Sequence, residues 1–513
     1  MSDRSPRPWL VAAPPIVLGV AVVVLLGALA AGAPEAPASP APVEWPTATP
    51  SGGSDEWVDP ASSGHPWSDE VDGILTFRGN PTRSWYGTGP VPTDPVEVWT
   101  YPDTAMCSES EVEQGEHSGT FEWCGTGWTG QPALFERDGR TWTVFGSYDK
   151  AVHFVDADTG DDILPPFPTG DIIKGTVTVD PDGYPLVYTG SRDDKMHIVA
   201  FDGDEARELW TYDADEVDGL WNDDWDASPL VIDDHLFQVG ENSWWFVWQL
   251  NRGEDADGRV TVDPELVFAA PGWDDELLED LGDEQVSIEN SIAISGDTAY
   301  FANSGGLVQG WDISGLRTDG SDPERVFRYW MGDDSDTTIV IDDEGFLYVA
   351  SQYERDNERE AEVGQVVKLD PSRPDDPVVW RWHDPDRRGV WATPAIQRDI
   401  LIVATDGGRV LGLDRATGEQ RWEMFLRGPT WQSPVVVDDV LIQGDCRGGM
   451  LRGFDVADTH VVPPQIWSVD LGGCIESTPA VWDGRIIVGT RGGFVHAIEQ
   501  REVQPRVVPP GGD

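Results

Sequence analysis

Three carboxylates recur at one position of a repeated sequence pattern. Asp226, Glu289 and Asp336 each lie two residues before the polar residue that heads an apolar strand, and Asn290 follows one of them. Carboxylate and amide oxygens are the ligands that Ca²⁺ takes in proteins. The candidate metal ligands are therefore Asp226, Glu289, Asn290 and Asp336.

The same position also holds residues of other types, and two tryptophans lie near it. Acidic groups that face indole rings can hold a cation, a sugar or a flat ring. The alternative is a wet channel capped by ordinary polar residues, with the tryptophans packed between neighbouring sheets. The sequence contains no convincing nucleophile elbow or triad, so no catalytic residue is predicted. The candidate ligand-binding residues are Trp128, Lys174, Trp225, Asp226, Glu289, Asn290, Asp336, Trp391, Trp431 and Glu476.

The elements that would position these residues form a repeat. From about residue 74 onward, four short apolar strands bounded by Gly and Asp recur, and the last of the four often contains Trp. Four short strands that recur in this way along the chain are typical of a β-propeller. We therefore predict an all-β, eight-bladed propeller of four-stranded antiparallel blades over residues 74–500. The eight repeats are headed by Gln131, Thr176, Ser228, Ser291, Thr338, Thr393, Ser433 and Thr478.

The eighth repeat shows only three strands. A strand of the missing type, Val96–Tyr101, lies upstream of the first repeat. A ring has to close to remove its sheet edges. We expect this N-terminal strand to pair with the eighth blade and close the propeller.

Strand order assigns the longest insertions to one face. If each first strand starts at the top face, the loops between strands two and three and the links between blades also lie there. The insertions at 102–128, 213–225, 270–287 and 351–365 are of these kinds, so we expect a ligand or partner at the top face.

The four cysteines are expected to form two disulfides. Cys107 and Cys124 lie in one insertion, which their bond would staple. Cys446 and Cys474 are expected at the top face of neighbouring blades, which makes a bridge between them plausible. Disulfides of this kind fit an exported protein.

The two ends of the chain differ from the repeat. Residues 1–33 contain Arg4 and Arg7 and then a long apolar run, which predicts a cytoplasmic tip with a single membrane anchor. A cleaved signal peptide is the competing interpretation, which would make the protein secreted. Residues 34–73 form a linker rich in Pro, Ala, Ser and Gly, and residues 501–513 form a polar tail.

The chain has a formal net charge of −59 over 513 residues. So acidic a surface repels phosphates, which excludes direct binding of nucleic acid. It also disfavours lying flat on an anionic membrane, so membrane contact is expected through the N-terminal anchor only.

One segment resembles a known family. The sequence GGRVLGLDRATGEQRW, Gly407 to Trp422, is similar to the pyrroloquinoline-quinone (PQQ) repeat of quinoprotein-like propellers. The leader FRGNPTRSWYGTGPVPTDPVEVWTY looks like the closing segment of such proteins. The family includes PQQ-dependent alcohol dehydrogenases and non-catalytic propellers such as the outer-membrane assembly lipoprotein. The adjacent cysteines of the dehydrogenases and the lipidated cysteine of the lipoprotein are both missing here.

Two functions remain open from the sequence. The first is a non-catalytic, exported, membrane-anchored monomer that binds a protein or an envelope component and has no cofactor. The alternative is an oxidoreductase that holds PQQ and Ca²⁺ in the channel. They differ in whether Asp226, Glu289 and Asp336 converge on one point or are spread around a wide channel.

Overall fold

The computed structural model describes residues 56–112, 119–128 and 130–502. The N-terminal anchor or signal segment, most of the predicted linker and the end of the C-terminal tail lie outside the described residues. None of the helices in the described part is long and apolar enough to cross a membrane.

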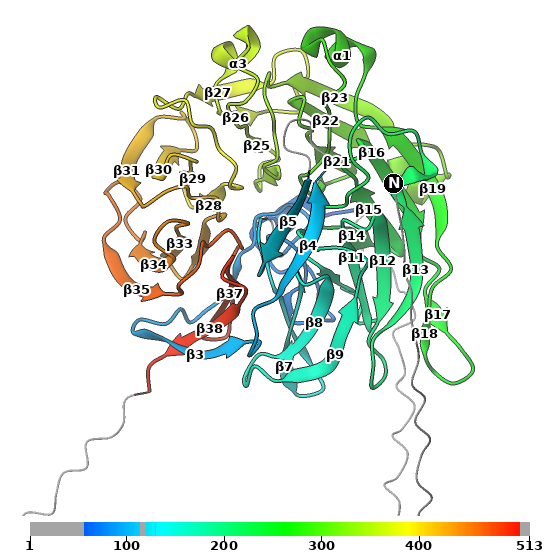
Figure 1. Cartoon of the computed structure of the whole chain (residues 1–513). Coiled ribbons are helices and arrows are strands. Elements are labelled where there is room, and N and C mark those ends of the chain that lie inside the picture. The colour runs from blue at the N-terminus through cyan, green and yellow to red at the C-terminus, as the bar shows by residue number, and fades with distance from the viewer. Residues whose placement is uncertain (1–55, 113–118, 129, 503–513) are drawn as a thin grey trace, which may run out of the picture. The chain divides into compact units, whose positions relative to one another are not determined.

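Eight antiparallel sheets form the ring of a β-propeller, as predicted (Figure 1). Blades one to four consist of β6 (Ala133–Arg137), β7 (Arg140–Ser147), β8 (Ala151–Asp156) and β9 (Asp162–Pro168); β10 (Thr178–Val179), β11 (Leu186–Gly190), β12 (Lys195–Ala200) and β13 (Arg207–Asp213); β14 (Leu230–Ile232), β15 (His235–Val239), β16 (Trp244–Gln249) and β19 (Glu265–Pro271); β20 (Ala293–Ser295), β21 (Thr298–Phe301), β22 (Leu307–Asp312) and β23 (Glu324–Trp330).

Blades five to eight repeat the same strand order. They consist of β24 (Val340–Ile341), β25 (Leu347–Ala350), β26 (Val366–Leu369) and β27 (Val378–Trp382); β28 (Ala395–Gln397), β29 (Ile400–Ala404), β30 (Arg409–Asp414) and β31 (Gln420–Phe425); β32 (Val435–Val437), β33 (Val440–Gly444), β34 (Met450–Asp455) and β35 (Gln465–Asp470); β36 (Ala480–Trp482), β37 (Arg485–Gly489), β38 (Val495–Gln500) and β3 (Pro95–Tyr101).

The remaining elements decorate this ring. Short strands extend three blades or insertions: β1 (Gly73–Ile74) pairs with β6, β2 (Gly87–Thr88) runs parallel to β36, and β17 (Gly253–Glu254) pairs with β18 (Val260–Thr261). A hairpin of β4 (Cys107–Val112) and β5 (Gly119–Cys124) fills the first insertion. The helices are α1 (Asp275–Leu281), α2 (Ser314–Thr318), α3 (Glu358–Val363) and the 3₁₀ turns Pro60–Ser62 and Ala214–Glu216.

The ring closes as the sequence predicts. β3 pairs antiparallel with β38, from Pro95 opposite Gln500 to Tyr101 opposite Val495. Figure 1 shows the N-terminal strand in blue beside the C-terminal strand in red. Trp99 then links this strand to blade one, since its indole N–H donates to the carbonyl oxygen of Ala157 at 3.0 Å. The two ends of the propeller therefore hold each other in place.

The outer strands share a bulge that explains their recurring aromatic residue. In seven blades one residue of the fourth strand is unpaired, immediately before an aromatic side chain. The partner strand leaves room for the ring: a Cβ atom at Gly412 or Gly453 would collide with Trp422 or Trp467. A bulge increases the local twist and disrupts the strand edge, which protects it from pairing with other chains.

The polar residues that head the repeats form a belt of hydrogen bonds. The backbone N–H of each of the first six donates to the side-chain hydroxyl of the next, at 2.8–3.2 Å. This hydroxyl belt runs from Gln131 through Thr176, Ser228, Ser291, Thr338 and Thr393 to Ser433. Thr478 returns to the start by donating to the carbonyl oxygen of Gly130 at 3.1 Å. Six of the eight junctions between neighbouring blades are thus bridged by a buried bond to a side-chain hydroxyl, and the junction of blade eight with blade one is bridged by a backbone bond.

A leader segment, residues 73–91, fills the channel between the innermost strands. Its carbonyl oxygens at Leu75, Pro81 and Thr82 accept hydrogen bonds from the first strands of blades two, four and five. The hydroxyl of Tyr86 accepts from blade six at 2.8 Å, and β1 and β2 pair with blades one and eight. The channel is therefore occupied by the chain itself over the length of these strands.

Two buried arginines complete the leader's contacts. Arg78 donates to the carbonyl oxygens of Pro394 and Pro434 at 2.5 and 2.6 Å, and Arg83 donates to those of Ile292 and Ser228 at 2.8 and 3.1 Å. Both side chains are fully buried. Burial lowers the pKa of Arg83 to about 9 and lowers that of Arg78 as well. Their backbone acceptors belong to blades three, four, six and seven, so the leader contacts all eight blades.

Both predicted disulfides are present. Cys107 bonds to Cys124 across the β4–β5 hairpin, and Cys446, in the blade-seven turn, bonds to Cys474, in the link to blade eight. The second bond joins neighbouring blades at the top face, the face from which the first strands start.

Candidate binding site at the channel mouth

A cavity of about 750 Å³ opens at the top face, on the other side of the hydroxyl belt from the leader segment. Most of its lining residues come from just before the belt positions, from the turns between second and third strands, and from the blade-three-to-four link. Trp123 on β5 and Trp221 in the blade-two-to-three link also line it. This mouth cavity is lined by seven carboxylic acids, three basic side chains and four tryptophans. The acids outnumber the bases, so the cavity is an acidic site.

Half of the ten predicted ligand residues line this cavity. They are Lys174, Glu289, Asp336, Trp391 and Trp431. Trp391 and Trp431 meet edge to face, with ring centroids 5.2 Å apart and planes at 87°. The prediction that residues two before each strand head face the channel mouth places these five side chains together.

The other five predicted residues support the cavity wall from behind or beside it. Trp128 stacks on Trp391 at 5.1 Å, and Trp225 is fully buried between blades two and three. Asn290 is fully buried too, with its amide bonded to the backbone of Ala302 and Ser335. It is therefore committed to joining blades four and five, not to a metal.

Asp226 and Glu476 each pair with a basic residue. Glu476 accepts from Arg491 at 3.1 Å. Asp226 is 1% exposed and contacts the ammonium of Lys174. Both acids are thus compensated by charges of the same chain.

Two of the three acids predicted to converge, Asp226 and Glu289, do lie together, but the third member of the cluster is Glu241 instead of Asp336, and the cluster surrounds a lysine. Oxygens of Asp226, Glu241 and Glu289 lie within 4.8 Å of one another, and the Lys174 ammonium is 3.6 Å from Glu241. Burial alone would lower the pKa of Lys174, yet the charges of Asp226 and Glu241 outweigh it and raise that pKa above its usual value. Lys174 thus supplies at this point the counter-charge that a Ca²⁺ ion would supply.

Asp336 is held rigidly, but only one of its two carboxylate oxygens accepts hydrogen bonds. Its Oδ2 accepts from the indole N–H of Trp391 at 2.8 Å and from Gln352 at 2.5 Å. Its Oδ1 is buried and has no hydrogen-bond partner, as is the case for one oxygen of Asp334 and one of Asp406. An unpaired buried polar atom is costly, so these oxygens are candidates for binding a donor.

Burial and mutual repulsion raise the pKa values of several of these acids. Burial raises the pKa of Glu289 to about 8, with a further contribution from the charge of Asp336. Burial, followed by the charge of Glu354, raises the pKa of Asp406 to about 7. The pKa values of Asp334 and Asp336 are raised by burial as well. These acids would therefore release protons, and so become more negative, when a cation binds in the cavity.

Sequence reasoning missed several residues of the site. Arg192, Asp406 and Glu354 lie in turns between second and third strands, and Asp334 lies two residues before Asp336. Strand order places these turns at the top face, so their polar residues were as predictable from the sequence as the long insertions.

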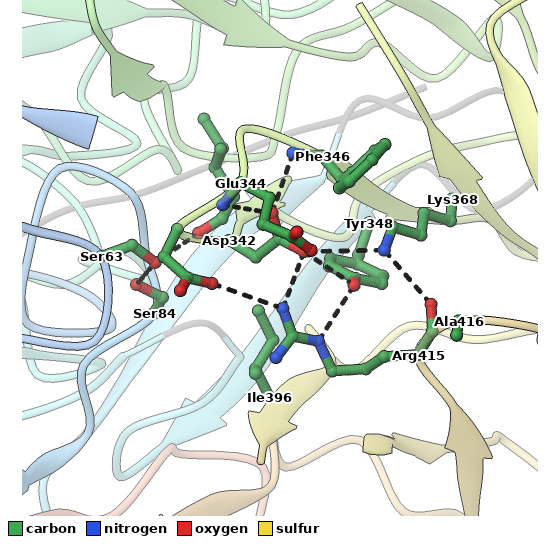
Figure 2. Close-up of polar contacts among 12 residues, drawn as sticks. Ser63, Ser84, Asp342, Glu344, Phe346, Tyr348, Lys368, Ile396, Arg415 and Ala416 are labelled. Carbon is green, nitrogen blue, oxygen red and sulfur yellow. Dashed lines mark hydrogen bonds and ion pairs between the residues drawn. The ribbon is translucent and has the colours of Figure 1, made fainter. Parts of the chain in front are cut away.

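A second cavity of about 430 Å³, the bottom cavity, lies on the opposite face of the ring, the bottom face, beside the leader segment. Figure 2 shows its polar centre: the Asp342 carboxylate faces Arg415, Tyr348 and Lys368. Arg415 donates to Asp342 at 2.8 Å and to the Tyr348 hydroxyl at 3.1 Å, and Asp342 accepts two backbone N–H groups as well. This network is satisfied internally and locks blade five to blade six, so we assign it a structural role.

Comparison with known proteins agrees with the fold. Residues 362–502 match the PQQ-type family described as outer membrane protein assembly factor BamB. This match covers the last part of the propeller, from blade five to blade eight. A comparison with curated protein sequences gives no significant match.

Several solved structures share the propeller fold. BamB from Moraxella catarrhalis has a TM-score of 0.52 at 14% identity, covering 79% of this chain and 99% of that one. The computationally designed Ika8 protein has a TM-score of 0.51 at 12% identity, covering 73% and 98%. Saccharomyces cerevisiae Sqt1 has a TM-score of 0.52 at 10% identity, covering 70% and 93%. At these identities the likeness concerns the fold alone.

The residues of the mouth cavity do not fit PQQ. This quinone carries several carboxylates, and the cavity presents seven acids against three bases. The carboxylates of the quinone and the acids of the cavity carry like charges, which repel each other. Trp391 and Trp431 are nearly perpendicular, so they do not form a parallel pair that could hold a flat ring between them.

Proposed function

We propose that this chain is a non-catalytic propeller that binds a protein or another envelope component with its top face. The observation that carries the proposal is the difference between the two ends of the channel. The leader segment fills the channel at the strands, whereas the other end opens into an acidic cavity surrounded by the long insertions. The BamB family description supports a scaffold role, and fold alone does not fix the partner.

We further propose that the protein works outside the cytoplasm as a monomer, held by its N-terminal segment or released after cleavage. Two disulfides support an oxidising compartment. Fractionation tests this point: the full chain should sediment with membranes after carbonate extraction, whereas a chain that starts at residue 56 should not. An anchor would be contradicted if the full chain, still intact, were recovered in the soluble fraction together with the shortened chain.

Site-specific photo-crosslinking tests the proposed binding face. A photoreactive phenylalanine analogue is placed at Phe121, which is 47% exposed on β5, or at Val462, which is 56% exposed between β34 and β35. Adducts with a discrete envelope component are expected from Phe121 and not from Val462. Adducts from Val462 alone, or equal adducts from both positions, would contradict binding at the top face.

A further inference from the structure

The basic side chains of the mouth cavity are already used. Lys174 pairs with Asp226 and Glu241, Arg192 pairs with Asp224, and Arg355 lies 3.3 Å from Asp283 and donates to the carbonyl oxygen of Ser304. In the described part of the chain, five acids of the cavity have no ion pair of their own. They are Glu289, Asp334, Asp336, Glu354 and Asp406.

One of these acids is also short of a donor. Asp336 is 4% exposed and lines the cavity, yet its Oδ1 has no hydrogen-bond partner. The unpaired oxygens of Asp334 and Asp406 belong to the same cavity. Together they form a set of buried acceptors that lacks donors, whereas the bottom cavity has no such deficit around Asp342.

The chain itself shows how it satisfies a buried aspartate of this kind. At the bottom face Asp342 accepts from Arg415 at 2.8 Å (Figure 2), and Asp180 accepts from Arg252 at 2.7 Å. In both cases the arginine comes from the next blade and the aspartate lies in the first turn of its own blade. A guanidinium suits such sites because its planar donors match carboxylate oxygens and its charge is permanent.

The tryptophans of the cavity complete the match. Trp391 is fixed by its bond to Asp336, and it meets Trp431 edge to face. Guanidinium groups stack on indole faces with a favourable cation–π contribution. Trp431 therefore offers an aromatic surface beside carboxylates that lack a cation.

We propose that the mouth cavity binds an arginine side chain of a protein partner, with Asp336 and Glu289 as acceptors and Trp431 against the guanidinium. The inference rests on the proposed function and specifies the chemistry that the top face recognises. A cavity of about 750 Å³ has room for a whole side chain, and Lys174 already supplies a point charge to the inner acids.

The test is a titration of the intact protein with the capped pentapeptide GGRGG. Calorimetry and tryptophan fluorescence monitor the binding. The matched peptide has citrulline in place of arginine, which keeps the shape and removes the charge. Saturable binding of the arginine peptide and at least tenfold weaker binding of the citrulline peptide are expected. This comparison uses the unaltered chain, so it does not depend on a variant that folds.

Two variants localise the effect. Asp336→Asn should weaken the arginine peptide at least tenfold, whereas Asp343→Asn should leave it unchanged because Asp343 lines the bottom cavity. Equal melting temperatures of the three proteins show that folding is intact. Equal affinity for the two peptides, unchanged binding by Asp336→Asn, or micromolar binding of Ca²⁺ alone that displaces the peptide would each overturn the proposal.

The outcome is separable from that of the proposed function. Crosslinks from Phe121 without discrimination between arginine and citrulline would leave the scaffold standing and remove the arginine site. Loss of both results would remove both proposals.

Discussion

Thr338 shows how one residue of the hydroxyl belt joins three blades of the ring. Its Oγ1 accepts from the backbone N–H of Ser291 at 3.0 Å, and its own N–H donates to the hydroxyl of Thr393 at 3.1 Å. The side chain is fully buried, so water cannot replace either bond. Residues of the hydroxyl belt are therefore structural contacts between blades and also fix the residues just before them, which line the mouth cavity.

Replacing Thr338 by valine keeps the shape and removes the acceptor. The N–H of Ser291 is then buried without a partner, which should lower the free energy of unfolding by about 1–3 kcal/mol. Thr338→Ser keeps the acceptor and should cost clearly less. Urea denaturation followed by tryptophan fluorescence gives both values, and equal losses for the two variants would show that the hydroxyl bond does not matter.

Glu289 gives the mouth cavity a pH dependence. Its pKa rises from 4.5 to about 8 on folding, so the folded chain keeps a proton that the unfolded chain releases in this range. The free energy of unfolding should therefore fall as the pH rises from about 4.5 to 8. Glu289→Gln cannot ionise, so it should flatten this decline and exceed the wild type in stability at pH 8. Parallel profiles of the two proteins between pH 5 and 8 would contradict the assignment.

At the scale of residues, the sequence predicts positions better than roles. The rule of two residues before each strand head places Lys174, Glu289 and Asp336 in one cavity. It cannot tell that Asn290 is consumed by backbone groups, because those acceptors have no side-chain signature. Nor can it tell that Lys174 neutralises Asp226, because that pairing depends on distances between neighbouring blades.

At the scale of elements, β3 is the strand on which the ring depends. It is the fourth strand of blade eight, and it is separated from the other three by almost the whole propeller. The repeat pattern predicts this pairing because a three-stranded last repeat and an orphan strand upstream complement each other. The contacts with β38 are therefore both long-range in sequence and necessary to cover an edge.

Replacing residues 95–101 by seven Gly and Ser residues keeps the chain length and removes the strand. The edge of β38 is then exposed, and the expected result is aggregation or a broad, non-cooperative unfolding transition. The same replacement in residues 503–509, beyond the last strand, is the control. Size-exclusion chromatography and thermal unfolding read the outcome, and a soluble, cooperative variant would show that β3 does not close the ring.

The leader segment was recognisable as a motif but not as the filling of the channel. Its residues have neither strand nor helix periodicity, and Arg78 and Arg83 bind main-chain carbonyl oxygens from distant blades. Such acceptors exist at every residue, so no pattern of side chains indicates them. Helix α3 escaped prediction for a local reason, because its six residues are too few to show a period.

At the scale of the whole molecule, the propeller has two unlike faces. The bottom face carries the satisfied Asp342–Arg415 network, and the top face carries the insertions and an acidic cavity with unpaired oxygens. A net charge of −59 adds a long-range field that attracts basic partners and weakens with salt. Overall architecture was predictable because eight repeats reinforce one another, whereas the chemistry of the mouth depends on a few single contacts.

Hydrogen exchange of the intact protein tests most directly that the leader segment fills the channel and that β3 closes the ring. The amides of residues 95–101 are expected to exchange as slowly as those of the central strands β7 and β33. The same is expected for Val179, Ile294 and Ile341, whose N–H groups donate to the leader at 2.8–3.0 Å. Rapid exchange at these amides, with the central strands still protected, would contradict a filled channel and a closed ring.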